Sequence, residues 1–268
     1  MAGIETGYET RFDFPRRADA PALVYLLASV PRSGSTYVSH LLWRCGCLGA
    51  PLEYLNFEPG GPHGFAHGAP TAQSRLWDEI LARRTGPNGV FGLKTFPEQM
   101  QALQDTNPAL LARVMRTLIP GRGQGRVVQL RRRDRTAHAI SYARAALSGI
   151  WRSEQEIGGR PEPAYSERAV INAGLSIDQQ ERVWQAMYRD LDLRPLVLCY
   201  EDVLADPAGA VAAVAAHLGV ALDPAAAVDI PEIARQSQTG AKVWREAHDR
   251  QAGEGREPLP PPHSPRAS

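Results

Sequence analysis

The sequence predicts an α/β fold with a mostly parallel central sheet. Short apolar runs at residues 22–30, 89–94, 126–130 and 196–200 are spaced along the chain. Their nearly continuous apolar character is typical of strands that are buried on both faces. Segments with helical periodicity stand between them, and strands that alternate with helices favour parallel pairing. In such sheets, ligands bind beyond the carboxyl ends of the strands.

The intervening segments show helix patterns and helix end signals. Helices are expected at residues 36–46, 76–84, 107–118, 136–150, 176–191 and 206–218. Gly46 and Gly219 stand where helices end, and Pro108 suits a first helical turn. Residues 50–74 are rich in Gly, Pro and His and are interpreted as one long loop, a type of segment that is often functional or disordered.

Length and composition predict three regions. Residues 1–20 are expected to form an N-terminal arm, residues 21–252 a single α/β domain, and residues 253–268 a disordered Pro-rich tail. The formal net charge of +1 gives no global signal for a nucleic acid or an anionic membrane, so no nucleic-acid partner is expected. Any anion site must therefore be local.

The cysteines and the hydropathy pattern indicate a cytoplasmic location. The chain has three cysteines, which form neither a disulfide framework nor a zinc pattern, so a reducing compartment is expected. No secretory leader is recognisable at the start of the sequence, and no apolar run approaches the roughly 20 residues that span a bilayer.

The loop Arg32-Ser33-Gly34-Ser35-Thr36 lies between the first expected strand and the first expected helix. Backbone N–H groups and hydroxyls at a helix N-terminus form a site for a phosphate-like anion. The motif lacks the Lys that precedes Ser/Thr in GxxxxGK[ST], and its cation, Arg32, stands in front. The pattern favours an anionic nucleotide over ordinary ATPase or GTPase chemistry. The alternative is a Ser-rich helix cap without a ligand.

Arg132 and Ser141 are candidates for a second phosphate site. Arg132 follows the third strand and Ser141 lies on the next helix, so a guanidinium and a hydroxyl could hold one anion. The alternative is a surface turn capped by Asp134, with Ser141 on a solvated face. Spacing does not determine which of residues 131–133 points inward.

Four further kinds of side chain are candidates for the remaining chemistry. Glu53 follows the first helix and could act as a general base, although a solvated loop glutamate is the plainer interpretation. Lys94 ends the second strand and is expected to hold the donor or face the acceptor. His63 and His67 have no metal-binding context and are expected near an acceptor pocket. Trp151 could stack on a purine or complete the core.

Together these pieces resemble the sulfotransferases that use 3′-phosphoadenosine 5′-phosphosulfate (PAPS), and the sequence looks most like the bacterial trehalose 2-sulfotransferase family. The resemblance spans most of residues 22–220 and is strongest in LLASVPRSGSTYVSHLL, GAPLEYL, PNGVFGLK and LRRRDRTAHAISYARAALSGIWR. It implies a P-loop-like three-layer αβα fold and a possible homodimer. It also implies that the donor is PAPS, that the product is adenosine 3′,5′-bisphosphate and that no metal is required.

The resemblance assigns roles to residues of this chain. It places the 5′-phosphosulfate on the loop 32–36 and the 3′-phosphate on Arg132 and Ser141. The catalytic glutamate of the family lies in a Glu-Pro-x-Glu-Phe segment, and the second glutamate of that segment matches Glu53. With Glu53 as base, Arg32 is expected to stabilise charge on the leaving phosphate.

Three departures concern the acceptor and the phosphate arginine. The first glutamate of that segment, which contributes to the family's sugar site, is Ala50 here, which argues against trehalose as the acceptor. Residues 55–74 are unlike the family, and Arg133 replaces a proline. The predicted function is sulfuryl transfer to a hydroxyl on a carbohydrate or glycosylated small molecule. The alternatives are a P-loop kinase-type phosphoryl transferase and a non-catalytic adenine-nucleotide-binding protein.

Overall fold

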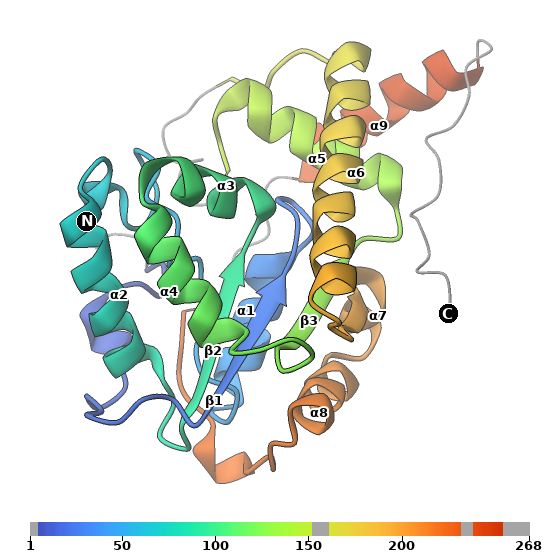
Figure 1. The fold of residues 1–268 in the computed structure, drawn as a ribbon. Coiled ribbons are helices and arrows are strands. Elements are labelled where there is room, and N and C mark those ends of the chain that lie inside the picture. The colour runs from blue at the N-terminus through green and yellow to red at the C-terminus, as the bar shows by residue number, and fades with distance from the viewer. Residues whose placement is uncertain (1–4, 152–160, 232–237, 254–268) are drawn as a thin grey trace.

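A computed structural model describes residues 5–151, 161–231 and 238–253. Its sheet contains the strands β1 (Leu23–Ala28), β2 (Val90–Thr95), β3 (Arg126–Arg131) and β4 (Leu196–Cys199), in the order β2-β1-β3-β4. Figure 1 shows β1 between β2 and β3. All three pairings are parallel, with Leu26 opposite Leu93 and Val127. The predicted α/β fold with a parallel sheet is confirmed.

The helices are α1 (Ser35–Arg44), α2 (Pro70–Arg84), α3 (Pro97–Thr106), α4 (Pro108–Leu118), α5 (Arg135–Ser148), α6 (Glu167–Asp190), α7 (Tyr200–Ala205), α8 (Pro207–Leu218) and α9 (Gln238–Gly253). Several begin at a residue whose side chain accepts a hydrogen bond from a first-turn N–H group, which satisfies one of the exposed donors there. Asn107, Asp134, Ser166 and Asp206 act in this way.

Alternation along the buried strands produces the three layers. Leu26 and Ala28 of β1 belong to a core cluster that includes Trp77 of α2 and Val114 of α4. Leu27, between them, belongs to a second cluster with residues of α1 and α8. Because successive side chains of a strand point to opposite faces, the sheet carries one apolar core on each side. This is the predicted αβα arrangement.

Several predicted boundaries were wrong. The stretch 50–74 is not one loop, because a 3₁₀ turn forms at Gly64–Ala66 and α2 already begins at Pro70. Helix α6 begins at Glu167, nine residues before the predicted start at 176, because Ser166 caps it there. Helices α3, α7 and α9 were not predicted. Helix α3 has only two buried residues, Pro97 and Leu103. A helix that buries so few side chains needs no regular apolar pattern, so the sequence carries no periodic signal for it.

The described part of the N-terminal arm packs against the main body of the chain. Phe14 is buried, and its backbone N–H donates to the carbonyl of Arg83 at 2.8 Å. The Arg84 guanidinium donates to the Gly7 carbonyl at 2.9 Å and pairs with Asp13 at 3.0 Å. These contacts fix the arm against α2 and lead it toward the carboxyl edge of the sheet.

The predicted division of the chain into arm, domain and tail stays a prediction. Helix α9 runs to Gly253, and residues 254–268 of the predicted disordered tail lie outside the described residues. None of the helices in the described ranges combines the length and the apolar composition needed to cross a membrane.

Candidate active site

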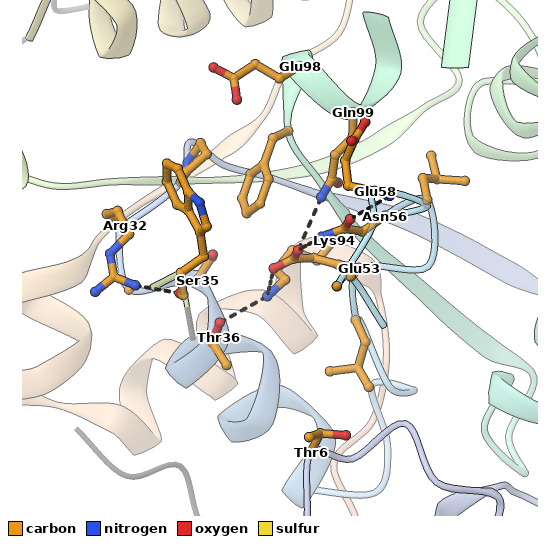
Figure 2. A pocket seen from close by; sticks show the side chains of 18 of the residues that line it. Thr6, Arg32, Ser35, Thr36, Glu53, Asn56, Glu58, Lys94, Glu98 and Gln99 are labelled. Carbon is orange, nitrogen blue, oxygen red and sulfur yellow. Dashed lines mark hydrogen bonds and ion pairs between the residues drawn. The ribbon is translucent and has the colours of Figure 1, made fainter. Parts of the chain in front are cut away.

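A cavity of about 1180 Å³ opens beyond the carboxyl ends of β1, β2 and β3. The N-terminal arm, the loop after β1, the segments after β2 and β3, and helices α5 and α9 all contribute to its wall. Figure 2 shows the part of the wall that runs from Arg32 through Thr36 and Lys94 to Gln99. Most of the predicted site residues line it, namely Arg32, Gly34, Ser35, Thr36, Glu53, His67, Lys94, Arg132, Ser141 and Trp151. The sheet topology therefore brings together side chains that are spread over 120 positions of sequence.

The loop after β1 has an unusual backbone. Arg32 has φ 67° and Gly34 has φ 91°, so two left-handed residues flank Ser33. Successive N–H groups in such a turn form a concave anion site, and α1 begins directly afterwards at Ser35. A left-handed conformation costs a non-glycine residue roughly 1–2 kcal/mol, which the surrounding contacts of Arg32 must offset.

His138 of α5 supports this loop from below. Its Nε2 lies 2.9 Å from the carbonyl oxygen of Pro31, and its side chain is buried. Burial lowers the pKa of His138 to about 3, and the nearby guanidinium of Arg132 acts in the same direction. The imidazole is therefore neutral at pH 7, and because it faces a carbonyl its Nε2 carries the proton and donates.

Two arginine side chains, Arg32 and Arg132, make contacts at the loop after β1. Arg32 Nε donates to the Ser141 hydroxyl at 3.1 Å, and Arg32 Nη1 donates to the Trp151 carbonyl at 2.7 Å. Arg132 Nη1 lies 3.4 Å from the Arg32 carbonyl, and its guanidinium stands 5.6 Å from the centre of the Tyr200 ring. The two guanidinium groups and the Ser141 hydroxyl are groups that can bind an anion by charge-assisted hydrogen bonds.

The structure distinguishes the three consecutive arginines. Arg131 pairs with Glu181 at 2.8 Å, and Arg133 pairs with the exposed Asp202 at 2.6 Å. Among the three, Arg132 is the one that lines the cavity, with a weaker pairing to Glu201 at 3.8 Å. Arg132 is therefore the one of the three arginines that points inward, which spacing alone did not determine.

Glu53 and Lys94 form an ion pair in the cavity wall. Lys94 Nζ lies 2.8 Å from Glu53 Oε1 and 3.2 Å from the Thr36 hydroxyl (Figure 2). The other oxygen of Glu53 accepts hydrogen bonds from the amide groups of Asn56 at 3.1 Å and Gln99 at 3.2 Å. Lys94 is only 1% exposed. A buried ammonium thus connects the anion loop with a carboxylate held by two amide donors.

The N-terminal arm reaches this carboxylate through Tyr8. The Glu53 backbone N–H donates to the Tyr8 hydroxyl at 2.9 Å, and both residues line the cavity. The Tyr8 ring meets Tyr54 edge-on, with ring centres 6.4 Å apart. A segment predicted only as an arm therefore helps to fix the backbone of the candidate base.

Two predicted residues do not line the cavity. His63 is buried in an aromatic cluster, with its ring 5.5 Å from Tyr8 and 6.3 Å from Tyr54, so it stands behind the cavity wall, and its place near an acceptor pocket stays a prediction. Ser33 is 1% exposed and contributes no side chain to the lining. His67 does line it, with Nδ1 at 3.1 Å from the Phe57 carbonyl.

Several lining residues were not found from the sequence. Gln99 and Tyr200 follow β2 and β4, so the rule that ligands bind beyond strand ends could have indicated them. Tyr8, Arg144 and Arg245 gave no signal, because their places in the cavity wall depend on how the arm, α5 and α9 pack in the folded chain. Arg245 reaches across to Asp134 at 3.1 Å. Within the described residues, no group of three or more His, Cys, Asp or Glu side chains could hold a metal ion.

The sequence is similar to those of known proteins. A family model described as Stf0 sulphotransferase matches residues 24–251. A trehalose 2-sulfotransferase of Mycobacterium tuberculosis is 26% identical over 257 residues, covering 82% of this chain and 92% of the relative. A trehalose 2-sulfotransferase of Mycolicibacterium smegmatis is 27% identical over 272 residues, covering 88% of this chain and 97% of that relative.

Two solved structures are also similar. The sulfotransferase domain from the Synechococcus PCC 7002 olefin synthase is 16% identical, with a TM-score of 0.41 over 87% of this chain and 90% of that chain. A sulfotransferase from Alicyclobacillus acidocaldarius is 15% identical, with a TM-score of 0.40 over 88% and 93%.

Proposed function

The chain belongs to the Stf0 sulphotransferase family, and from this premise we propose that it moves a sulfuryl group from PAPS to a hydroxyl of a carbohydrate or glycosylated small molecule. It is a sulfotransferase, so the kinase-type and non-catalytic alternatives are set aside. The finer proposal rests on one observation: the loop 32–36 and Glu53 line the same cavity, and Lys94 contacts both Thr36 of the loop and Glu53.

The donor's phosphosulfate is proposed to lie on the loop. The left-handed residues Arg32 and Gly34 support a turn of N–H groups at the start of α1, and the hydroxyls of Ser35 and Thr36 line the same wall. Anions at a helix N-terminus are stabilised by these donors and by the helix dipole. In this proposal the positive charge of Arg32, which lines the same cavity, stabilises the leaving phosphate.

The nucleotide's 3′-phosphate is proposed to bind Arg132 and Ser141. Arg132 is the inward one of three arginines, and Ser141 already accepts a hydrogen bond from Arg32, so a phosphate there would be shared by two guanidinium groups. Trp151 lines the same end and is 39% exposed, which leaves part of its ring accessible to a purine.

Glu53 is proposed as the general base. The acceptor oxygen forms its bond to sulfur while the bond between sulfur and the bridging phosphate oxygen breaks, and the electron pair stays on the phosphate. The acceptor's proton passes to the Glu53 carboxylate. Like phosphoryl transfer, this reaction depends on positioning and electrostatic stabilisation. The two amide donors on Glu53 orient the carboxylate for this step.

The acceptor is proposed to be a hydroxyl compound other than trehalose. Both mycobacterial relatives are trehalose 2-sulfotransferases, which supports a carbohydrate. Ala50, however, is fully buried and does not line the cavity, so this position offers no carboxylate to a sugar. Polar groups of Asn56, His67 and Gln99 share the wall with apolar side chains such as Leu55, a combination suited to a sugar with an apolar part.

Calorimetric titration without magnesium tests this proposal. Adenosine 3′,5′-bisphosphate is expected to bind with micromolar or lower Kd, at least about tenfold more tightly than adenosine 5′-monophosphate, because a charge-assisted phosphate contact contributes roughly 1.5–3 kcal/mol. Equal affinity for the two nucleotides would overturn the PAPS assignment. A screen of sugar hydroxyl acceptors with PAPS then identifies the acceptor by the sulfated product.

A further inference from the structure

We propose that Lys94 exchanges partners during the reaction: its ammonium holds Glu53 in the donor-free enzyme and turns to the phosphosulfate when PAPS binds. This inference rests on the proposed function and concerns how the donor site controls the base. Its starting point is that one ammonium contacts both halves of the cavity, at 2.8 Å from Glu53 Oε1 and 3.2 Å from the Thr36 hydroxyl.

Burial explains why Lys94 needs an anion at all times. Its side chain is 2% exposed and that of Glu53 is 12% exposed, so water contributes little to the ammonium. Leaving a buried charge without its partner costs several kcal/mol. The ammonium can therefore leave Glu53 only when a second anion arrives within its reach.

The position of Thr36 indicates where that anion arrives. Thr36 lies in the first turn of α1, directly after the left-handed Gly34, where the donor's phosphosulfate is proposed to bind. An ammonium has three N–H donors and can rotate between partners without losing all of its contacts. Because it already contacts the Thr36 hydroxyl, a small movement of the side chain brings it to a sulfate or bridging oxygen.

The exchange has a consequence for Glu53. The neutral amides of Asn56 and Gln99 can still donate to the carboxylate after Lys94 has left it. A carboxylate that loses a cation becomes a stronger base, since the cation had favoured its ionised form. Glu53 thus gains basicity only when the sulfuryl group is in place.

A double-mutant cycle on PAPS binding tests the exchange. The dissociation constant of PAPS is measured by calorimetry, without acceptor, for the wild type, Lys94→Met, Glu53→Gln and the double variant. If the two charges act on PAPS from fixed positions, their effects are additive. If Lys94 must leave Glu53 to reach PAPS, part of its contribution to binding in the wild type is offset by the cost of breaking the ion pair. The loss of PAPS affinity caused by Lys94→Met is then expected to be roughly fivefold or more larger in the Glu53→Gln background than in the wild type.

The control is another lysine–glutamate pair of the chain. Lys242 lies 4.0 Å from Glu246 on α9 and is 80% exposed, so Lys242→Met is expected to leave PAPS binding unchanged. Equal effects of Lys94→Met in the two backgrounds, with PAPS still bound, would overturn the exchange while leaving the proposed function intact. Absence of PAPS binding by the wild type would instead overturn the proposed function.

A crystal structure of the wild-type protein with PAPS provides a test that does not depend on how the variants fold. The exchange predicts that Lys94 Nζ lies within hydrogen-bond distance of a donor oxygen and beyond 4 Å, roughly the limit of an ion pair, from Glu53 Oε1. An ion pair still at its donor-free distance in that complex would overturn it.

Discussion

Arg32 Nε donates a hydrogen bond to the hydroxyl of Ser141 at 3.1 Å, across 109 positions of sequence. The bond joins the loop after β1 to helix α5, and Arg132 approaches the same loop through the Arg32 carbonyl. The two proposed phosphate sites are therefore adjacent parts of one cationic wall. This arrangement predicts which side chains discriminate between nucleotides with and without a 3′-phosphate.

Replacing Arg132 by alanine is expected to weaken binding of adenosine 3′,5′-bisphosphate about tenfold or more, with a much smaller effect on adenosine 5′-monophosphate. The reason is that a charge-assisted hydrogen bond to the 3′-phosphate is lost. Calorimetry of both nucleotides measures the difference. Arg133→Ala is the matched control, because Arg133 is exposed and pairs with Asp202. A similar loss for both nucleotides would remove Arg132 from the 3′-phosphate site.

Replacing Glu53 by glutamine is expected to lower turnover by about 10²–10⁴, because an amide cannot take the acceptor's proton. The amide keeps the shape of the side chain but leaves the buried Lys94 ammonium without its carboxylate, so the variant is expected to be less stable and its folding is checked by circular dichroism. Transfer of ³⁵S from labelled PAPS to an identified acceptor gives the rate. Glu79→Gln serves as control, because Glu79 on α2 forms an exposed ion pair with Arg16 of the N-terminal arm. Turnover within a few-fold of the wild type would exclude Glu53 as base.

Replacing Gly34 by alanine is expected to abolish nucleotide binding. Gly34 has φ 91°, and an added Cβ would lie 2.3 Å from the Tyr200 ring, so either the loop or this ring, both of which line the cavity, must move. Gly219→Ala is the control, because Gly219 also has a positive φ but no atom within 4 Å of the added Cβ. Both variants are expected to lose roughly 1 kcal/mol of stability from the backbone conformation. Wild-type affinity of Gly34→Ala would show that the loop does not hold the donor.

Local patterns were sufficient to predict the sheet and the loop, since both depend on residues close together in sequence. The apolar runs at 22–30 and 89–94 are typical of strands that are buried on both faces, and they form the neighbouring strands β1 and β2. The glycine of Arg32–Thr36 marked the turn before α1. Position at strand ends then placed Lys94 and Arg132 at one edge.

Contacts that depend on tertiary packing could not be predicted. Tyr8 reaches a backbone N–H group 45 positions away, and no periodicity encodes such a contact. His63 and His67 have the same loop context, yet one ring is buried among aromatic side chains while the other lines the cavity. Composition cannot separate them, because the direction of a loop side chain is set by the elements on which the loop packs.

From the pKa of His138 we predict how the unfolding free energy of the protein depends on pH. The pKa of His138 in the folded protein is about 3, well below the ordinary value of about 6.5, chiefly because burial disfavours the imidazolium. As the pH falls below 6.5, the unfolded chain binds a proton at His138 that the folded chain does not. The contribution is therefore complete above pH 6.5 and is lost progressively between pH 6.5 and pH 3.

Comparison of the wild type with His138→Gln measures this contribution. Between pH 7.5 and pH 5.5 the wild type is expected to lose about 1 kcal/mol more of its unfolding free energy than the variant, whose amide does not titrate but can still donate to the Pro31 carbonyl. Urea denaturation at both pH values gives the two differences. The pKa of His40 is also lowered by burial, to about 4, but His40 is present in both proteins and its effect cancels. Equal losses in the two proteins would mean that His138 is protonated in the folded state, and the hydrogen bond to Pro31 would then come from an imidazolium.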